Sequence, residues 1–321
     1  ESIRCTATRW WADMVAEHVT VNEVGPRDGL QSQTRTLDGD GRLAMIRALV
    51  EAGLHSIEAG SFVSPKAVPQ MAGTGELFAR LPGRDEVRYS ALVPNARGYE
   101  LARGAGVGTV SVVLSATETM NRRNINMGLD ETTAACAELM ARAAADGIEG
   151  WAYLAVAYEC PFEGPTPPAQ VERLAARMLG AGARKLIIAD TIGAANPAQV
   201  RHLIGNLVRA DGARHVACHF HDTRGMALAN VLAALEEGVR DFDSSIGGLG
   251  GCPFSPGASG NVATEDVVLM LESMGLRTGI DLDALVAAVE RVSELLESPL
   301  GGHAFRWLRR RAGQAKGGAH V

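Results

Sequence analysis

Two histidines near residue 220 are spaced so that they could bind a metal ion together. The segment Val216–Asp222 begins with apolar residues typical of a strand, and alternate residues of a strand point to the same side. His219 and His221 therefore present two imidazoles on one face, which is a reasonable half-site for a divalent cation. A His-x-His pair alone is more often structural, so a metal site needs a further ligand from elsewhere in the chain.

The end of the first candidate strand offers such a ligand. The segment Asn22–Gly29 places two acids and an arginine around a Gly-Pro turn. Taken alone, this segment could equally be a surface turn with an ion pair. Together with the two histidines, Asp28 favours a metal site, and Arg27 would bring a fixed positive charge beside it.

A glycine-rich segment, Gly247–Asn261, follows the last candidate strand and contains one cysteine. Glycine tolerates positive φ without strain, so the segment could be a mobile lid that brings the Cys252 thiol over the site. The alternative is that Cys252 is an ordinary small residue in a linker. Asn261 could offer a carbonyl oxygen to a hard metal. Asp28, His219, His221 and Asn261 would then give two nitrogens and two oxygens, which suits Mg²⁺ or Mn²⁺ better than a closed zinc site.

Short apolar or β-branched runs alternate with helical patterns along most of the chain. The candidate strands are His18–Val24, His55–Glu58, Val87–Val93, Val107–Leu114, Glu149–Ala157, Lys185–Asp190, His215–Phe220 and Asp241–Ser245. Helical spacing of apolar residues is clearest in Leu228–Leu235 and Val267–Met274. Thr264 is the expected N-cap of the second helix, and a further helix is expected at Leu282–Leu296.

Eight strand–helix units without a composition break predict one α/β domain, a closed TIM (β/α)₈ barrel. We expect the barrel to span residues 1–280 and a C-terminal helix and tail, residues 281–321, to pack on it. The alternative is an open doubly wound sheet, but Pro253 replaces the third glycine of a GxGxxG pattern and no Walker loop is present. In a barrel, functional residues gather at the C-terminal ends of the strands, which is where the motifs above lie.

Composition limits the partners. The formal net charge of -6 argues against nucleic acid, and the basic run Arg306–Arg311 is interpreted as a solvated end. No apolar stretch is long enough to span a membrane, and no charged-then-apolar leader opens the sequence. The five cysteines show no paired spacing, so we expect a cytoplasmic protein. They are Cys5, Cys136, Cys160, Cys218 and Cys252.

Several sequence blocks, in one order from Val21 to Gly279, resemble the 3-hydroxy-3-methylglutaryl-CoA lyases. These enzymes belong to a larger group of metallolyases and Claisen-type synthases on the same barrel. The blocks are Val24–Gln31, Ser61–Lys66, Asn124–Asn126, Cys160–Gly164, Asp190–Gly193 and the loop around Cys252 through Asp266. The synthases usually read His-x-His-Asn-Asp, whereas His221-Asp222-Thr223 looks like the lyase version.

The resemblance implies a role for each matching residue. It makes Asp28, His219, His221 and Asn261 the ligands of Mg²⁺ or Mn²⁺. It places Arg27 beside the thioester carbonyl and makes Cys252 the acid/base thiol, while the base stays open between Asp28, a histidine such as His219, and water. Gln31, Glu58, Ser61, Asn124 and Asp190 would lie in or behind the substrate pocket, and Glu23 and Glu265 would hold Arg27 and its neighbours. The substrate would be an acyl-CoA thioester, and the protein a homodimer or higher homo-oligomer.

The expected reaction is cleavage of 3-hydroxy-3-methylglutaryl-CoA to acetyl-CoA and acetoacetate, a step of leucine degradation. The chain departs from the family at Ala59-Gly60, where Thr-Thr or Val-Thr is usual, at Ala67, where tryptophan or a similar bulky residue is usual, and at Ile187, where serine is common. Tyr158-Glu159 is also unusual. These changes suggest that a larger or differently branched substrate is recognised, such as 3-hydroxy-3-isohexenylglutaryl-CoA or citramalyl-CoA. A Claisen-type synthase and an inactive binding barrel are further alternatives.

Overall fold

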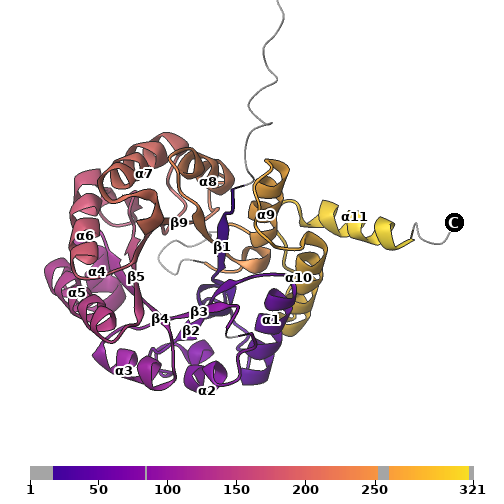
Figure 1. The fold of residues 1–321 in the computed structure, drawn as a ribbon, viewed down its shortest axis with the longest axis horizontal. Coiled ribbons are helices and arrows are strands. Elements are labelled where there is room, and N and C mark those ends of the chain that lie inside the picture. The colour runs from indigo at the N-terminus through magenta and orange to yellow at the C-terminus, as the bar shows by residue number, and fades with distance from the viewer. Residues whose placement is uncertain (1–16, 84, 252–259, 318–321) are drawn as a thin grey trace, which may run out of the picture.

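Eight parallel strands close into a barrel in the computed structural model, which describes residues 17–83, 85–251 and 260–317 (Figure 1). Their order around the barrel is β1-β10-β9-β8-β5-β4-β3-β2. Their bounds are β1 Thr20–Glu23, β2 Ser56–Ser61, β3 Arg88–Leu92, β4 Thr109–Ser115, β5 Glu149–Ala155, β8 Lys185–Asp190, β9 Val216–Phe220 and β10 Asp241–Ser244. The predicted barrel is therefore confirmed, and each predicted strand end lies within three residues of the observed one.

The predicted strand Glu149–Ala157 ends two residues early, at Ala155. Val156 adopts a positive φ of 50°, which a β-branched residue rarely does and which cannot continue a strand. The Thr191 hydroxyl accepts from Val156 N, and the Thr166 hydroxyl donates to Val156 O, so hydrogen bonds on both sides hold this turn. A small antiparallel hairpin, β6 (Glu159–Cys160) and β7 (Gly164–Pro165), follows.

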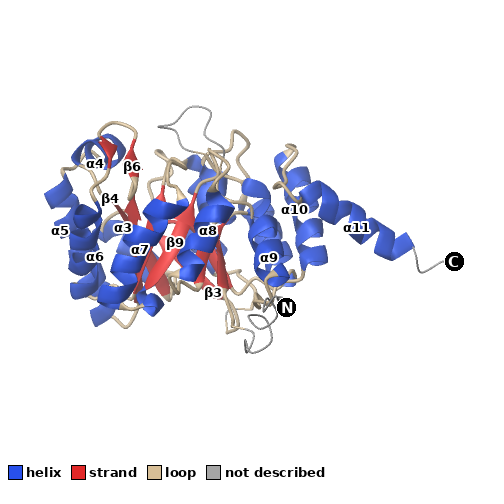
Figure 2. Cartoon of the chain, turned by 90° about the horizontal axis from the view of Figure 1, so that it is seen from above, coloured by secondary structure: helices blue, strands red, loops and turns tan. Residues whose placement is uncertain are grey.

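Helices surround the barrel as a ring, and the main hydrophobic core lies between them and the strands (Figures 1 and 2). The helices up to residue 273 are α1 Gly39–Glu51, α2 Thr74–Phe78, α3 Ala96–Gly104, α4 Glu118–Ile125, α5 Leu129–Ala145, α6 Pro168–Gly180, α7 Pro197–Asp211, α8 Ala227–Glu236 and α9 Thr264–Ser273, of which α4 lies at one end of the barrel beside β6 (Figure 2). Short helical turns are η1 Gly25–Gly29, η2 Pro69–Met71, η3 Ala213–His215 and η4 Ile246–Gly248. None of the helices in these described ranges is long and apolar enough to cross a membrane.

The expected N-cap of α9 is wrong by one residue. Ala263 occupies the cap position, and it provides no side-chain hydrogen bond. The Thr264 hydroxyl donates instead to Glu23 Oε2 at 2.6 Å. The Thr264 side chain thus ties the start of α9 to the end of β1.

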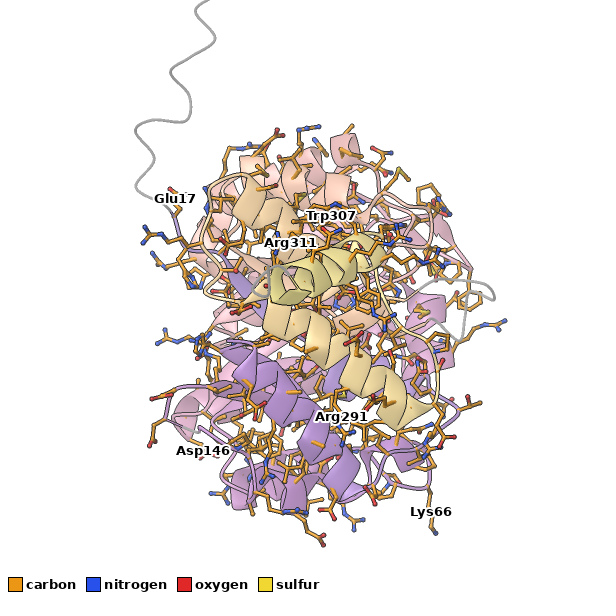
Figure 3. All side chains as sticks on the ribbon, turned by 90° about the vertical axis from the view of Figure 1, so that its right-hand side faces the viewer. Glu17, Lys66, Asp146, Arg291, Trp307 and Arg311 are labelled. Carbon is orange, nitrogen blue, oxygen red and sulfur yellow. The ribbon has the colours of Figure 1, made fainter. Side chains whose placement is uncertain are left out.

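Two helices follow the barrel. Helix α10 (Leu282–Leu296) confirms the prediction and packs against α1 and α9. Helix α11 (Phe305–Gly317) contacts α10, contains the buried Leu308, and then extends away from the barrel (Figures 1 and 2). Figure 3 shows Trp307 and Arg311 on α11 above α10. Ion pairs join Arg309 to Glu290 and Arg311 to Asp283, so part of the basic run is paired with α10. The boundary at residue 280 stays a prediction.

Candidate active site

The ends of β1 and β9 bring three predicted metal ligands together. Asp28 lies in η1, directly after β1, while His219 and His221 lie at the C-terminal end of β9. One ligand atom from each lies within 4.8 Å of the other two. Asn261 lies beside them, because an isolated bridge pairs it with His221 and its Nδ2 donates to Asp28 Oδ2 at 2.8 Å.

The free atoms of this cluster fit a divalent cation. His221 Nδ1 and Asn261 Oδ1 are buried without a hydrogen-bond partner in the described part of the chain. Burial and the neighbouring His219 lower the pKa of His221 to about 4, so His221 is neutral at pH 7, as a metal ligand must be. Burial opposes ionisation of Asp28, but the charges of Arg27 and the histidines lower its pKa to about 2. The cluster therefore presents two imidazoles, a carboxylate and an amide oxygen, a donor set that suits a hard divalent cation.

Asp243, on β10, orients His219 from inside the barrel. His219 Nδ1 lies 3.0 Å from Asp243 Oδ2, and Tyr153 and Asn22 donate to the same carboxylate at 2.8 Å each. Burial lowers the pKa of His219, but the hydrogen bond and charge of Asp243 raise it above the ordinary value. Such a carboxylate keeps the proton on Nδ1 and leaves Nε2 for a ligand. Asp243 was not among the residues predicted from the sequence, although an acid in the middle of a buried strand was a usable signal.

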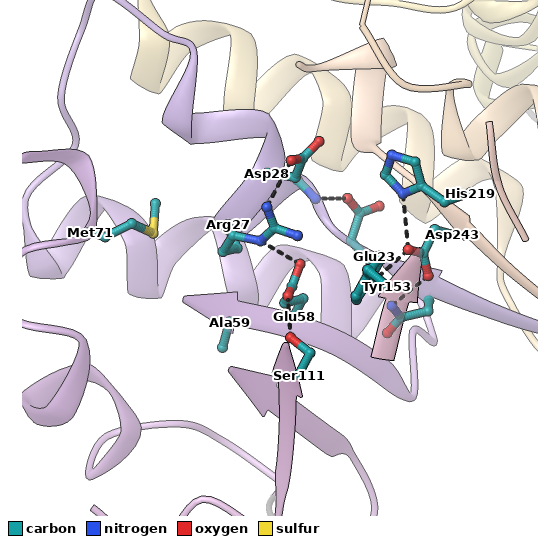
Figure 4. A network of polar contacts seen from close by, with 12 residues as sticks. Glu23, Arg27, Asp28, Glu58, Ala59, Met71, Ser111, Tyr153, His219 and Asp243 are labelled. Carbon is teal, nitrogen blue, oxygen red and sulfur yellow. Dashed lines mark hydrogen bonds and ion pairs between the residues drawn. The ribbon is translucent and has the colours of Figure 1, made fainter. Parts of the chain in front are cut away.

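Arg27 is a buried cation held by two carboxylates (Figure 4). Its Nε donates to Glu58 Oε2 at 2.6 Å, and its Nη1 donates to Asp28 Oδ1 at 2.8 Å. Ser111 donates to the second oxygen of Glu58 at 3.1 Å. Burial opposes the charged form of Arg27, but the two carboxylates raise its pKa. The guanidinium is therefore charged and fixed next to the metal-site cluster.

The expectation that Glu23 and Glu265 hold Arg27 and its neighbours is correct only for the neighbours, because both carboxylates accept from nearby backbone amides and the partners of Arg27 are Glu58 and Asp28. Glu23 accepts from Gly25 N and Ile246 N, at 2.7 and 2.9 Å. Glu265 accepts from Gly247 N at 3.0 Å and from Gly302 N at 2.7 Å. The two acids thus fix the loops on either side of the site, while Glu58 and Asp28 hold Arg27.

The other predicted pocket residues lie in different surroundings. Ser61, at the end of β2, is buried with no partner for Oγ in the described part of the chain. Asp190 accepts from the backbone of Ala194 and Ala195 with its two oxygens, and burial nevertheless raises its pKa to about 6. Asp190 therefore closes the turn after β8. Gln31 and Asn124 are exposed. Cys252 lies outside the described residues.

The positions at which this chain departs from the family do not all enlarge a pocket. A Cβ at Gly60 would lie 2.6 Å from Arg42 Nη2, so the space beside Gly60 is already filled. Ala59 is fully buried in the main core, and Ile187 is fully buried in a small cluster with Trp151 and Tyr153. Ala67 is exposed. The prediction of extra room is wrong for Gly60, and for Ala59, Ala67 and Ile187 it stays a prediction.

Comparison with known proteins shows the family of this chain. The family model HMGL-like matches residues 18–292. Hydroxymethylglutaryl-CoA lyase from Pseudomonas mevalonii is 46% identical over 278 residues, which cover 87% of this chain and 92% of that protein. The 3-hydroxy-3-isohexenylglutaryl-CoA/hydroxy-methylglutaryl-CoA lyase of Pseudomonas aeruginosa is 40% identical over 90% of this chain and 97% of its own length. A crystal structure of hydroxymethylglutaryl-CoA lyase from Pseudomonas aeruginosa superposes with a TM-score of 0.89 at 39% identity, covering 92% of this chain and 98% of that one. The chain therefore belongs to the HMGL-like family and is a lyase.

Proposed function

We propose that this protein is a metal-dependent lyase that cleaves 3-hydroxy-3-methylglutaryl-CoA to acetyl-CoA and acetoacetate. The observation that carries the proposal is the convergence of Asp28, His219 and His221 beside the buried Arg27–Glu58 ion pair. Asn261 completes the donor set with its free amide oxygen. Mg²⁺ or Mn²⁺ held by these four residues would supply Lewis-acid chemistry and a template for substrate oxygens.

Arg27 provides the fixed charge that the reaction needs. Breaking the bond between C2 and C3 leaves an electron pair on the acetyl-CoA portion, as an enolate whose oxygen is negative. A preorganised cation next to that oxygen lowers the barrier, because it does not have to reorganise during the reaction. The carboxylates of Glu58 and Asp28 hold the guanidinium in place on two sides.

Two proton transfers complete the step. A base takes the proton of the C3 hydroxyl, and Asp28, His219 and water are the candidates. The hydroxyl oxygen then becomes the ketone oxygen as the C2–C3 bond breaks. Cys252 is proposed to protonate C2 of the enolate, and this assignment rests on the family resemblance because Cys252 lies outside the described residues.

A larger or differently branched acyl chain is the second candidate substrate. One relative is described as acting on an isohexenylglutaryl-CoA as well as on hydroxymethylglutaryl-CoA. Another relative, 40% identical, is named (R)-citramalyl-CoA lyase. The exposed Ala67, where the family usually carries tryptophan, favours a site with more room.

A cleavage assay over a panel of 3-hydroxyacyl-CoA thioesters tests the proposal. We expect Mg²⁺- or Mn²⁺-dependent release of acetyl-CoA that stops in chelator and returns when metal is added. One methylene is worth about 1–3 kcal/mol in an apolar pocket, so the rates across the panel rank the acyl chains. Full activity in chelator would contradict the metal assignment, and condensation of acetyl-CoA with a 2-oxo acid would identify a synthase instead.

We further propose a cytoplasmic homodimer or higher homo-oligomer that binds neither nucleic acid nor membranes. The negative net charge supports the absence of a nucleic-acid partner. Light scattering of the purified protein measures the oligomeric state, and a monomeric mass would contradict this part of the proposal.

A further inference from the structure

Arg42, on α1, is a buried cation outside the site described above. Only 1% of its surface is exposed, and among the ion pairs of the described residues none involves it. Its guanidinium donates to Ala59 O and Ala72 O at 3.0 Å each and to Thr74 Oγ1 at 3.3 Å. Burial lowers the pKa of Arg42 to about 10, so the group is still charged at neutral pH. Burying a cation without an acid is costly, so this placement calls for a reason.

The Ala59 carbonyl belongs to an irregular step in β2. Glu58 pairs with Ser90 and Gly60 pairs with Ala91, so the register shifts by one residue and Ala59 has no pairing partner on β3. Extra residues of this kind disrupt the ladder, and they re-aim side chains near functional sites. The Arg42 guanidinium supplies the Ala59 carbonyl with a hydrogen bond there.

Gly60 gives Arg42 the space to do this. A Cβ at position 60 would lie 2.6 Å from Arg42 Nη2 and 2.9 Å from Thr74 Oγ1, both closer than real contacts. The departure from the family at Ala59-Gly60 thus has a local reason, since the volume of a larger side chain at position 60 is taken by the guanidinium. The same guanidinium holds Ala72 and Thr74, so it also ties the start of α2 to β2.

We propose that Arg42 is a positioning residue for the reaction: it fixes the irregular step of β2 and thereby the place where Glu58 meets Arg27. Glu58 is the residue directly before the step, and its Oε2 lies 2.6 Å from Arg27 Nε. Arg42 acts through backbone, in contrast to Glu58, which contacts Arg27 itself. The inference rests on the proposed function for its effect on turnover.

The test uses Arg42→Met, Arg42→Lys and Gly60→Ala, with Arg47→Met as the control. Arg47 lies on the same helix and is exposed. We measure kcat and KM for 3-hydroxy-3-methylglutaryl-CoA, Mn²⁺ affinity by calorimetry, and the thermal midpoint. A misplacement of about 1 Å can cost about 100-fold in rate, so Arg42→Met should lower kcat by about 10- to 100-fold. KM should change little, and Mn²⁺ affinity should fall less than kcat, because His219, His221 and Asn261 lie on other elements and Asp28 is the ligand that contacts Arg27.

Two variants separate positioning from general loss of structure. Arg42→Lys should recover part of kcat, because an ammonium can still donate to Ala59 O but cannot reach all three acceptors. Gly60→Ala keeps the cation but displaces it, and should lower kcat as Arg42→Met does. Folded Arg42→Met with near-normal kcat would overturn the inference, as would a fall in kcat that only parallels lost Mn²⁺ affinity. If the Arg42 variants do not fold, the kcat of Gly60→Ala is the test of the inference, and a normal kcat in that variant overturns it.

A measurement without substrate keeps this inference separate from the proposed function. In ¹⁵N-arginine-labelled protein, the Nε–H signal of Arg27, assigned with Arg27→Lys, reports its hydrogen bond to Glu58. Arg42→Met should shift that signal and speed its exchange with water, while Arg47→Met should not. An unchanged Arg27 signal overturns the inference. A wild-type protein that cleaves no thioester of the panel would contradict the proposed function alone.

Discussion

Among the single residues of the site, Asp28 contacts both Arg27 and the metal-site cluster. One oxygen accepts from Arg27 Nη1, and the other accepts from Asn261 Nδ2. Its carboxylate also lies among the ligand atoms of His219 and His221. A cation bound there would share Asp28 with Arg27, so metal binding and the position of the guanidinium are coupled through one carboxylate.

His221→Ala tests the metal cluster directly. The change removes a neutral imidazole whose Nδ1 has no partner in the described part of the chain, and it leaves the Arg27–Glu58 pair intact. Loss of outer support alone costs about 10–100-fold in metal affinity, so loss of a ligand should cost at least as much. Calorimetric titration with Mn²⁺ measures the change. His202→Ala, on the exposed face of α7, is the control, and equal affinities in the two variants would contradict the assignment.

Asp243→Asn tests how His219 is oriented. The amide cannot compensate the charge of an imidazole as the carboxylate does, and it can turn a donor toward Nδ1. We expect activity or metal affinity to fall by about 10–100-fold while the fold is retained. Asp241→Asn, two residues earlier on β10, is the matched control because Asp241 pairs with Lys185 instead. Equal effects of the two substitutions would show that Asp243 has no special role.

Much of the element pattern was predictable, because each strand is a short apolar run and the C-terminal ends of parallel strands meet at one face. This is why Asp28 and His219 could be expected to lie close together in space, although nearly the whole barrel lies between them in the sequence. The contacts of Asp243 and Arg42 were not predictable in the same way. They depend on the register of β10 against β9 and on the packing of α1 against β2, which connect residues 24 and 17 positions apart. No periodicity in the sequence encodes such side-chain contacts.

Glu23 makes the junction of β1 with α9 sensitive to pH. It accepts three hydrogen bonds, and burial nevertheless raises its pKa from 4.5 to about 7. The folded protein therefore holds this proton more tightly than the unfolded chain does. Its contribution to stability is fully present below pH 4.5 and is lost as the pH rises through 7. The expected slope is up to about 1.4 kcal/mol per pH unit in that window.

Urea unfolding at pH 5, 6, 7 and 8 measures this effect. Other buried acids, Asp190 among them, also titrate in this range, so the comparison is between variants. Glu23→Gln has no titratable proton at position 23, so the unfolding free energy should depend less steeply on pH than in wild type. Glu17→Gln, at an exposed position, should leave the slope unchanged. An identical slope in wild type and Glu23→Gln would show that Glu23 does not titrate there.

At the scale of the whole molecule, a segment that follows the barrel in sequence packs back onto the barrel. Residues 302–304, between α10 and α11, lie on the first turn of α9. Glu265 accepts from Gly302 N, and the two oxygens of Asp266 accept from His303 N and Ala304 N, at 2.7 to 2.8 Å. His303 Nε2 also lies 2.8 Å from Asp222 Oδ2, one residue after His221. The C-terminal segment is thus joined to the residue that follows His221, just beyond the end of β9.

Two truncations should separate this segment from α11. A chain ending at Ala304 loses the burial of Leu308, about 1.5–3 kcal/mol, and exposed ion pairs that contribute little. A chain ending at Ser298 also loses the amides that satisfy Glu265 and Asp266, two acids that are at least 96% buried. A buried acceptor left without its donor costs about 1–3 kcal/mol, and more when it is charged. The free energy of urea unfolding should therefore fall by several kcal/mol between the two truncations, and Mn²⁺ affinity should fall only in the shorter chain. Equal stability of the two chains would mean that residues 299–304 merely cover the surface.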